Sequence, residues 1–108
     1  MFYTYILRSK KDHKFYTGFT NNLKERYKFH KLGKVASTKH RGELELIYFE
    51  SCINEIDAIR REKYLKSGLG KRFLKSRLKF WYKTFKIRAV ARKNFMVLIN
   101  FDRIRIEY

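Results

Sequence analysis

Aromatic and aliphatic residues alternate with polar ones in two short runs near the start of the chain. The first run covers residues 3–7 (Tyr-Thr-Tyr-Ile-Leu) and the second covers residues 15–19 (Phe-Tyr-Thr-Gly-Phe), with the polar residues 10–13 (Lys-Lys-Asp-His) between them. Period-two alternation on either side of a polar turn is typical of a β-hairpin. The pattern therefore predicts two neighbouring antiparallel strands at the N-terminus.

After residue 20 the spacing of apolar residues changes to that of an α-helix. Four residues recur at i, i+3, i+4 and i+7 and would share one helical face: Leu23, Arg26, Tyr27 and His30. Asn22 is followed three residues later by Glu25, a pairing typical of the first turn of a helix. Gly33 suits the position just beyond its end. We therefore expect a helix that carries arginine and histidine on one face.

Alternation returns over residues 43–50, after a polar and basic loop at residues 34–41. It predicts a third, buried strand with Leu44, Leu46 and Tyr48 on one face and Ile47 and Phe49 on the other.

Two helices are expected to follow. Asn54, with Asp57 three residues on, would cap a second helix that runs to Ser67, and Gly70 would precede a third, basic helix from Lys71 to about Lys83. The predicted order is β-β-α-β-α-α, an α/β domain with a small, mainly antiparallel three-stranded sheet covered by helices.

The composition indicates one folded domain. The chain has 108 residues, of which 44% are hydrophobic and 18% aromatic, so the first 78 residues are not expected to be disordered. Cys52 is alone and excludes an internal disulfide, which fits a reducing cytoplasm. The apolar run at residues 2–7 is too short for a signal peptide, and no run approaches a membrane span. We expect a cytoplasmic protein.

The charge balance points to a polyanionic partner. The chain has 27 Lys and Arg against 10 Asp and Glu, a formal charge of +17. Nucleic acid is favoured because neutralising its phosphates releases counterions, and an anionic membrane is the competing partner. The residues expected to contact nucleic acid are Lys24, Lys34, Lys39, His40, Arg41, Lys66, Lys71, Arg72 and Lys75. The alternative for them is a merely solvated basic face.

Residues 79–108 form a separate, basic and aromatic extension. They open with Phe80, Trp81 and Tyr82 and end with strand-like alternation over residues 104–108. The extension is either an added helix and strand or a tail without selected structure. We therefore divide the chain into a domain at residues 1–78 and this extension.

Glu62 is the carboxylate most suggestive of chemistry. Ala58, Ile59, Leu65 and Leu69 lie one or two turns from it, so it should sit on the inward face of the second helix. One explanation is a buried salt bridge to Arg60, Lys66 or Arg26. The other is an oxygen ligand for one Mg²⁺ ion that keeps most of its waters and touches a phosphate. His13 and His40 lack the spacing of a zinc site.

Tyr5 and Tyr16 should lie close together across the hairpin. Aromatic pairs in this arrangement most often serve packing. A phenol has a pKa near 10, so it needs help from nearby cations to act as a base at neutral pH, and Arg26, Lys24 and His30 could supply it. Gly18 would let the backbone approach the substrate or bend the strand, and the alternative is a simple bulge.

These motifs together resemble the GIY-YIG nuclease domain, in particular its short stand-alone bacterial form, which is similar to the N-terminal nuclease domain found in excinuclease ABC. The resemblance rests on Tyr5, on Tyr16 with Gly18, on residues 20–26 (Thr-Asn-Asn-Leu-Lys-Glu-Arg) with His30, and on residues 61–66 (Arg-Glu-Lys-Tyr-Leu-Lys). The chain has Tyr-Thr-Tyr and Tyr-Thr-Gly where the family name has Gly-Ile-Tyr and Tyr-Ile-Gly. The asparagine that many members carry near the end of the domain has no evident counterpart.

The resemblance implies a role for each site residue. Glu62 would hold Mg²⁺ or Mn²⁺, Tyr5 would help deprotonate the attacking water, and Tyr16 and Arg26 would hold the phosphate while His30 moves a proton. The implied function is metal-dependent hydrolysis of DNA phosphodiester bonds, in DNA repair or recombination. The alternative is a non-catalytic nucleic-acid-binding module on the same fold.

Overall fold

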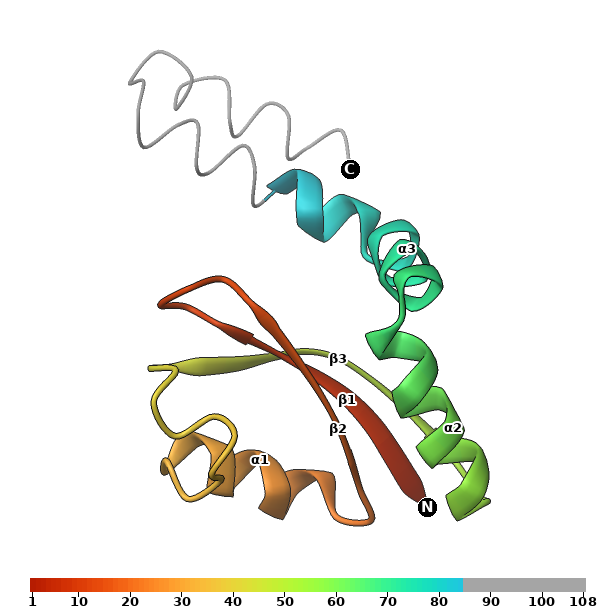
Figure 1. Cartoon of the computed structure of the whole chain (residues 1–108), viewed down its shortest axis with the longest axis horizontal. Helices are drawn as coiled ribbons and strands as arrows, with labels where there is room; N and C mark the ends of the chain where they lie inside the picture. The colour runs from red at the N-terminus through yellow and green to blue at the C-terminus, as the bar shows by residue number, and fades with distance from the viewer. Residues whose placement is uncertain (85–108) are drawn as a thin grey trace. The chain divides into compact units, whose positions relative to one another are not determined.

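The computed structural model describes residues 1–84, which belong to two compact units, one at residues 1–68 and one that begins at residue 69. The first unit holds a three-stranded sheet and two helices: β1 (Phe2–Ser9), β2 (Phe15–Thr20), α1 (Leu23–Lys31), β3 (Leu44–Cys52) and α2 (Glu55–Lys66). Helix α3 (Gly68–Arg77) follows. The element order β-β-α-β-α-α confirms the predicted α/β fold class (Figure 1).

The sheet has the order β2-β1-β3, and both of its strand pairs are antiparallel. In the β1–β2 register Tyr5 lies opposite Gly18, and Leu7 lies opposite Tyr16. Tyr5 and Tyr16 are therefore diagonal neighbours on one face, as the hairpin pattern predicted. The ladder is continuous at Gly18, so the alternative of a simple bulge at this glycine is wrong.

A bulge instead interrupts the β1–β3 pairing. Tyr5 pairs with Phe49 and Ile6 with Tyr48, but Leu7 pairs with Leu46, so one residue of β3 is skipped. An extra residue reverses the alternation beyond it. Phe49 therefore lies on the same face as Leu46. The predicted face assignment, which grouped Leu46 with Tyr48 and opposed both to Phe49, is wrong for this reason.

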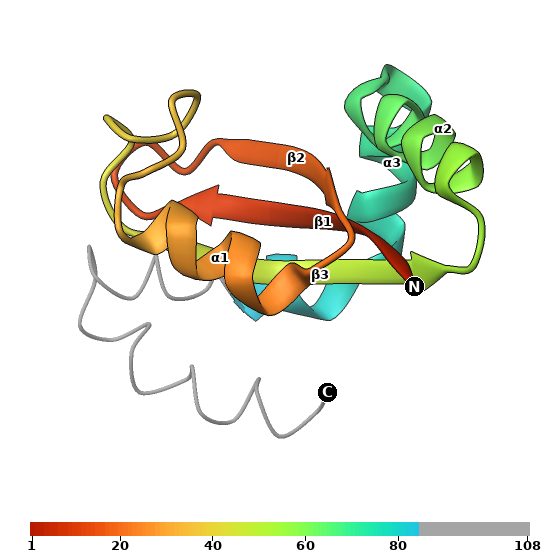
Figure 2. The same cartoon turned by 90° about the horizontal axis from the view of Figure 1, so that it is seen from below.

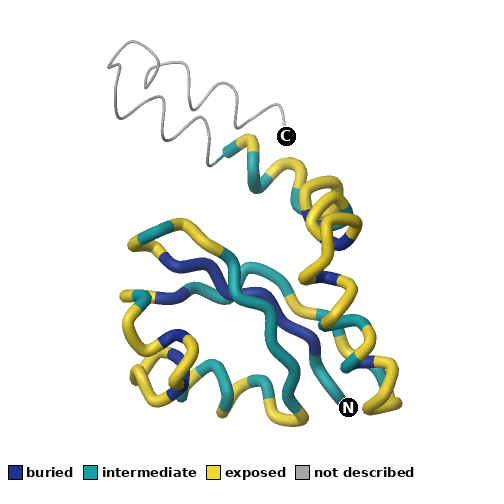
Figure 3. The backbone as a smooth tube through the Cα atoms, viewed as in Figure 1, coloured by how far each residue is buried: buried dark blue, intermediate teal, exposed yellow. Residues whose placement is uncertain are grey.

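The two helices of the first unit cover different sides of the sheet (Figures 1 and 2). On one side Tyr5 and Leu7 form a buried cluster, against which Leu23 and Tyr27 of α1 pack. Thr4 faces the other side, where its hydroxyl donates to the carbonyl of Ala58 in α2 at 2.9 Å. Burial is greatest in β1, the central strand, which is buried from Thr4 to its end at Ser9 (Figure 3).

Side-chain caps fix where α1 and α2 begin. The Asn22 side chain accepts a hydrogen bond from the amide of Glu25, and Asn54 accepts from the amides of Ile56 and Asp57. Both caps were predicted. Gly33, just after α1, has a φ of +71°, a backbone conformation that suits glycine.

The third helix starts earlier than predicted. It begins at Gly68, and Gly70 is buried inside it rather than preceding it. Ser67 alone separates it from α2, since the Ser67 amide and hydroxyl both bond to the Tyr64 carbonyl and end that helix. The helix ends at Arg77, and helical structure resumes over residues 79–84.

Most of the predicted extension lies outside the described residues. This holds for residues 85–108, including the alternation at 104–108, and the division of the chain at residue 78 stays a prediction. Within residues 1–84, no helix combines the length and apolar character needed to cross a membrane.

Candidate active site

The Tyr5 hydroxyl is the centre of a buried polar cluster between β1 and α1. Tyr5 is 2% exposed, and its hydroxyl lies 2.9 Å from Nε2 of His30. Nε of Arg26 donates to the same hydroxyl at 3.4 Å. Arg26 and His30 reach the phenol together because they are one helical turn apart on the face of α1 that packs on the sheet. The structure thus brings three predicted site residues into contact.

Gly18 makes room for the Tyr5 ring. A Cβ atom at this position would overlap Cζ and the hydroxyl oxygen of Tyr5 and would lie 2.8 Å from its Cε1. The ring therefore crosses the adjacent strand directly over the glycine. A side chain of the site itself approaches the backbone closely at Gly18, and the predicted approach of this backbone to the substrate stays a prediction.

His30 is held from both ring nitrogens. Nδ1 lies 2.7 Å from the hydroxyl of Thr38, which is 2% exposed in the loop after α1. Burial of the ring, and then the positive charge of Arg26, lower the pKa of His30 from 6.5 to about 4. The imidazole is therefore neutral at pH 7. With its proton on Nδ1, which then donates to Thr38, Nε2 is an acceptor for the Tyr5 hydroxyl.

The Tyr5 phenol is neutral at the same pH. Burial raises its pKa above 10.0, the hydrogen bond and charge of Arg26 oppose this shift, and the carboxylate of Glu62 adds to it. Tyr5 can act as a base only if its own proton leaves as it takes another. The neutral His30 Nε2 is placed to receive that proton.

Tyr16 presents a buried hydroxyl that has no hydrogen-bond partner within residues 1–84. Burial raises the pKa of this phenol; the Arg41 guanidinium, 5.4 Å from the ring centroid, opposes the shift. The Asp12 carboxylate is near enough to raise the pKa further, yet it does not meet the geometry of a hydrogen bond to it. Buried polar atoms are nearly always paired, so an unpaired one next to Tyr5 suits a ligand oxygen.

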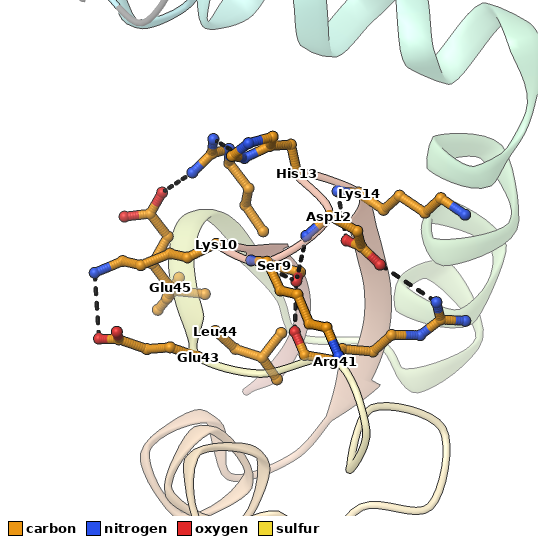
Figure 4. Close-up of polar contacts among 12 residues, drawn as sticks. Ser9, Lys10, Asp12, His13, Lys14, Arg41, Glu43, Leu44 and Glu45 are labelled. Carbon is orange, nitrogen blue, oxygen red and sulfur yellow. Dashed lines mark hydrogen bonds and ion pairs between the residues drawn. The ribbon is translucent and has the colours of Figure 1, made fainter. Parts of the chain in front are cut away.

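A set of polar contacts holds the turn between β1 and β2 to the end of the loop that precedes β3 (Figure 4). The Ser9 hydroxyl donates to the Arg41 carbonyl at 2.5 Å, and the Arg41 guanidinium pairs with Asp12 at 3.3 Å. Arg41 was predicted as a nucleic-acid contact. Its guanidinium pairs with a carboxylate and lies over the Tyr16 ring, and the contact with nucleic acid stays a prediction.

Glu62 lies on the half-buried part of α2. Ala58 and Leu65 flank it and are buried, as predicted, but Leu69 is 63% exposed and lies beyond the end of this helix. The Glu62 side chain is 21% exposed, and its nearest cation is Lys66 at 3.8 Å. So long a pair with a half-exposed lysine one turn away is weak, and it leaves the carboxylate available to a ligand that approaches from solvent.

The donor set around Glu62 fits a hard divalent ion bound through one carboxylate. Among residues 1–84 no group of three or more His, Cys, Asp or Glu side chains could enclose a metal. Mg²⁺ is often held by one or two carboxylates, with waters and substrate phosphates as its other ligands. Glu62 is therefore the residue that would hold such an ion.

A family model described as the GIY-YIG catalytic domain matches residues 1–77. The chain belongs to this family.

Several bacterial relatives match the same region. The chain is 48% identical to a UPF0213 protein of Clostridium perfringens over 67 residues, which are 61% of this chain and 71% of the relative. It is 43% identical to one from Oceanobacillus iheyensis over 65 residues (59% and 74%), and 41% identical to one from Pediococcus pentosaceus over 80 residues (73% and 79%). These names state no activity. No solved structure matches.

The other residues predicted to contact nucleic acid are exposed. Lys24, Lys34, Lys39 and His40 are exposed in the first unit, and Lys66 is exposed beside Glu62. In the second unit α3 exposes Lys71, Arg72 and Lys75. Sequence reasoning missed Thr38, because a threonine in a basic loop gives no sign that the loop folds back to bury it.

The lowered pKa of His30 predicts a loss of stability in mild acid. The unfolded chain takes up the His30 proton near pH 6.5, whereas the folded domain does so only near pH 4. The neutral His30 therefore contributes fully to the free energy of unfolding above pH 6.5. This contribution, at most about 3 kcal/mol, is lost as the pH falls to about 4. Melting temperature should fall across this range.

A His30→Gln variant is the control, since it lacks the titrating group and its melting temperature should vary less over the same range. Asp12 does not interfere, because a hydrogen bond from the Lys14 amide lowers its pKa below 3.8 and its contribution is lost only at lower pH. Parallel pH profiles of the two proteins would contradict the prediction.

Proposed function

We propose that this GIY-YIG domain is a metal-dependent endonuclease that hydrolyses DNA phosphodiester bonds, with Tyr5, Tyr16, Arg26, His30 and Glu62 as its catalytic residues. Membership of the family supports nuclease activity in general. The observation that carries the assignment to these residues is the buried contact of the Tyr5 hydroxyl with His30 and Arg26.

The proposed proton path runs from water to Tyr5 to His30. As the water oxygen attacks phosphorus, its proton passes to the Tyr5 oxygen, and the phenolic proton passes to Nε2 of the neutral His30. The new bond joins the water oxygen to phosphorus, and the bond to the leaving oxygen breaks. That oxygen then takes a proton from solvent. Arg26 stabilises negative charge on the phenol oxygen while the proton moves.

Two further side chains position the phosphate. The Tyr16 hydroxyl is buried without a partner among residues 1–84 and would donate to a phosphate oxygen. Glu62 would hold Mg²⁺ or Mn²⁺, which when bound supplies positive charge that stabilises the transition state. Both groups lie near Tyr5: Tyr16 is its diagonal neighbour across β1 and β2, and the Glu62 charge reaches its phenol.

The deciding experiment is cleavage of labelled DNA by the purified full chain. Single-stranded, duplex, nicked, flapped and branched substrates would be incubated with Mg²⁺, with Mn²⁺ and with chelator. We expect cleavage that needs the metal and that falls on the order of 10²- to 10⁴-fold in Tyr5→Phe, which lacks the proton-accepting oxygen. Tyr64→Phe, a change at a partly exposed tyrosine of α2, should keep full activity.

Binding without cleavage would favour the alternative, a non-catalytic nucleic-acid-binding module. In that case no substrate would be cut with either metal, and Tyr5→Phe and Glu62→Gln would bind nucleic acid as well as the original chain. DNA repair or recombination would be the setting of either activity.

The charge of the chain predicts that binding weakens steeply with salt. Each duplex phosphate neutralised adds about −0.9 to the slope of log affinity against log salt. Replacing Lys34 and Lys39 together with glutamine should make this slope shallower by about two. Lys10→Gln is the matched control, because its ammonium already pairs with Glu43 at 3.2 Å.

The measurement is anisotropy of labelled duplex in chelator over a range of salt concentrations. A slope that does not change between the double variant and the original chain would remove these two lysines from the interface.

A further inference from the structure

A hollow lies at the start of α1, where two of its lining residues, Leu23 and Tyr27, also pack against the buried cluster of Tyr5 and Leu7. It is an open pocket of about 420 Å³, within the size range of small-molecule sites. Its walls are mostly apolar and come from β1, β3 and α1: Tyr3, Leu23, Tyr27, Leu46 and Phe49. Asn21 and Lys24 stand among the residues that line it. None of the catalytic residues proposed above lines this pocket.

Because of the bulge in β3, the pocket lies on the face of the sheet that carries Tyr5. The bulge turns Phe49 onto the face of Tyr5, its direct partner across the β1–β3 ladder. Tyr3 lies two residues before Tyr5 and on the same face, and its ring packs against that of Phe49 with the centroids 6.2 Å apart and the planes tilted by 58°. Tyr3 and Phe49 therefore form an aromatic wall on the face of the sheet that also carries Tyr5.

The pocket is preformed, and its aromatic wall is accessible. The Tyr27 hydroxyl donates to the Leu44 carbonyl at 3.3 Å and accepts from the Leu46 amide at 3.4 Å, which fixes that side chain against β3. Phe49 lies on an edge strand and is 50% exposed. Its exposed ring can stack on a ligand without any rearrangement of the core.

The polar groups at the pocket are of two kinds. Asn22 is committed to the helix cap, because its side chain bonds to both the amide and the carboxylate of Glu25. Asn21 and Lys24 are exposed, and neither side chain makes a polar contact within residues 1–84. The Asn21 amide can pair with both donors and acceptors, and the Lys24 ammonium suits a phosphate.

We infer that this pocket binds an unpaired nucleobase of the substrate strand, stacked on Phe49 and Tyr3, with Asn21 at its polar edge and Lys24 on its phosphate. The inference rests on the proposed function and deepens it. Stacking on aromatic side chains is the usual way in which proteins hold single-stranded bases. A base that is stacked here cannot remain paired in a duplex.

Electrostatics favours a nucleic acid over a second copy of the chain. The formal charge of +17 and the Lys24 ammonium at the pocket attract a polyanion, whereas two copies would repel each other. The expected substrates are accordingly single-stranded or locally unpaired nucleic acids, such as flaps, gaps and mismatches, for which the cost of unpairing is small.

The test is binding of oligonucleotides in chelator, so that no cleavage takes place. A single strand that carries one 2-aminopurine reports stacking by quenching of its fluorescence, and a strand with an abasic residue at that position reports binding without the base. We expect Phe49→Ala to abolish the quenching and to weaken single-strand binding about tenfold, the scale of one lost stack. Affinity for the abasic strand and for perfect duplex should not change.

Three further variants make the test specific. Phe49→Tyr should keep the quenching, and Phe49→Leu, which keeps an apolar side chain but no aromatic face, should lose it. Ile53→Ala is the matched control, since Ile53 is 83% exposed and outside the pocket. All variants should share one melting temperature within a few degrees.

Three results would overturn the inference. One is equal weakening of the abasic and the ordinary strand by Phe49→Ala, and another is quenching that survives this change. The third is a dimer in sedimentation that Phe49→Ala dissociates, because a second copy would then fill the pocket. Failure of the nuclease proposal is separate: the chain would stack a base in chelator yet cut nothing when metal is added.

Discussion

Replacing Glu62 with glutamine should abolish most DNA cleavage while leaving the domain folded. The side chain keeps its shape, but it loses the charge that would hold a divalent ion amid many lysines and arginines. We expect the cleavage rate to fall on the order of 10²- to 10³-fold, the usual effect of removing one electrostatic contributor to a transition state. Stabilisation of the fold by Mg²⁺ or Mn²⁺ should disappear with it.

DNA binding should persist in the same variant, or even tighten, because a negative charge near the phosphates has gone. A purely structural role predicts the opposite. The pair with Lys66 at 3.8 Å would be lost, and cleavage would fall only in step with the folded fraction. Because Lys66 is more than half exposed, this pair should contribute little to stability, and we expect the melting temperature to change only slightly.

Glu55→Gln is the matched control for this prediction. Glu55 lies in the first turn of the same helix and is exposed, so its loss removes one charge from α2 without touching the site. Melting temperature, affinity and cleavage would be measured on one preparation of each variant. Cleavage by Glu62→Gln at the original rate in the presence of metal would disprove the mechanism.

The smallest change with a large expected effect is Gly18→Ala. The added methyl group would overlap the Tyr5 ring at its Cζ and hydroxyl oxygen, and the ring is too firmly packed to move freely. Either the ring shifts and the Tyr5 hydroxyl loses its hydrogen bonds to His30 and Arg26, or β1 and β2 move apart. We expect cleavage to fall as far as in Tyr5→Phe, on the order of 10²- to 10⁴-fold. We also expect a loss of about 1–3 kcal/mol in stability, as for other overpacked cores.

Gly68→Ala separates this effect from the general consequences of replacing a glycine. A Cβ at Gly68 has no atom within 4 Å, and its φ is not in the left-handed region. This variant should keep full activity and be at least as stable as the original chain. Thermal unfolding and cleavage assays on both variants test the pair of predictions.

A double variant shows whether Gly18 acts through Tyr5. If it does, Gly18→Ala should cost little further activity once Tyr5 is already phenylalanine, because the two changes remove the same interaction. Full additivity of the two losses would instead mean that the glycine serves the substrate directly.

Local sequence determined the elements and the order of the site residues. Alternation on either side of a polar turn predicted the hairpin, and the capping side chains of Asn22 and Asn54 predicted where two helices begin. Both patterns depend on interactions between residues that are close in the chain, so the sequence shows them directly. Helical spacing put Arg26 and His30 on one face of α1. Two tyrosines eleven positions apart became diagonal neighbours because the turn fixes the register of the hairpin.

Only the tertiary structure decided what these residues touch. The contact between the Tyr5 ring and Gly18, the bond from His30 to Thr38 and the pairing of Arg41 with Asp12 all join separate elements, and no local pattern specifies them. The neutrality of His30 follows from burial, a property of the packed domain. The bulge in β3, which turned Phe49 onto the face of Tyr5, arises in the pairing of distant strands, so strict alternation along the chain could not predict it.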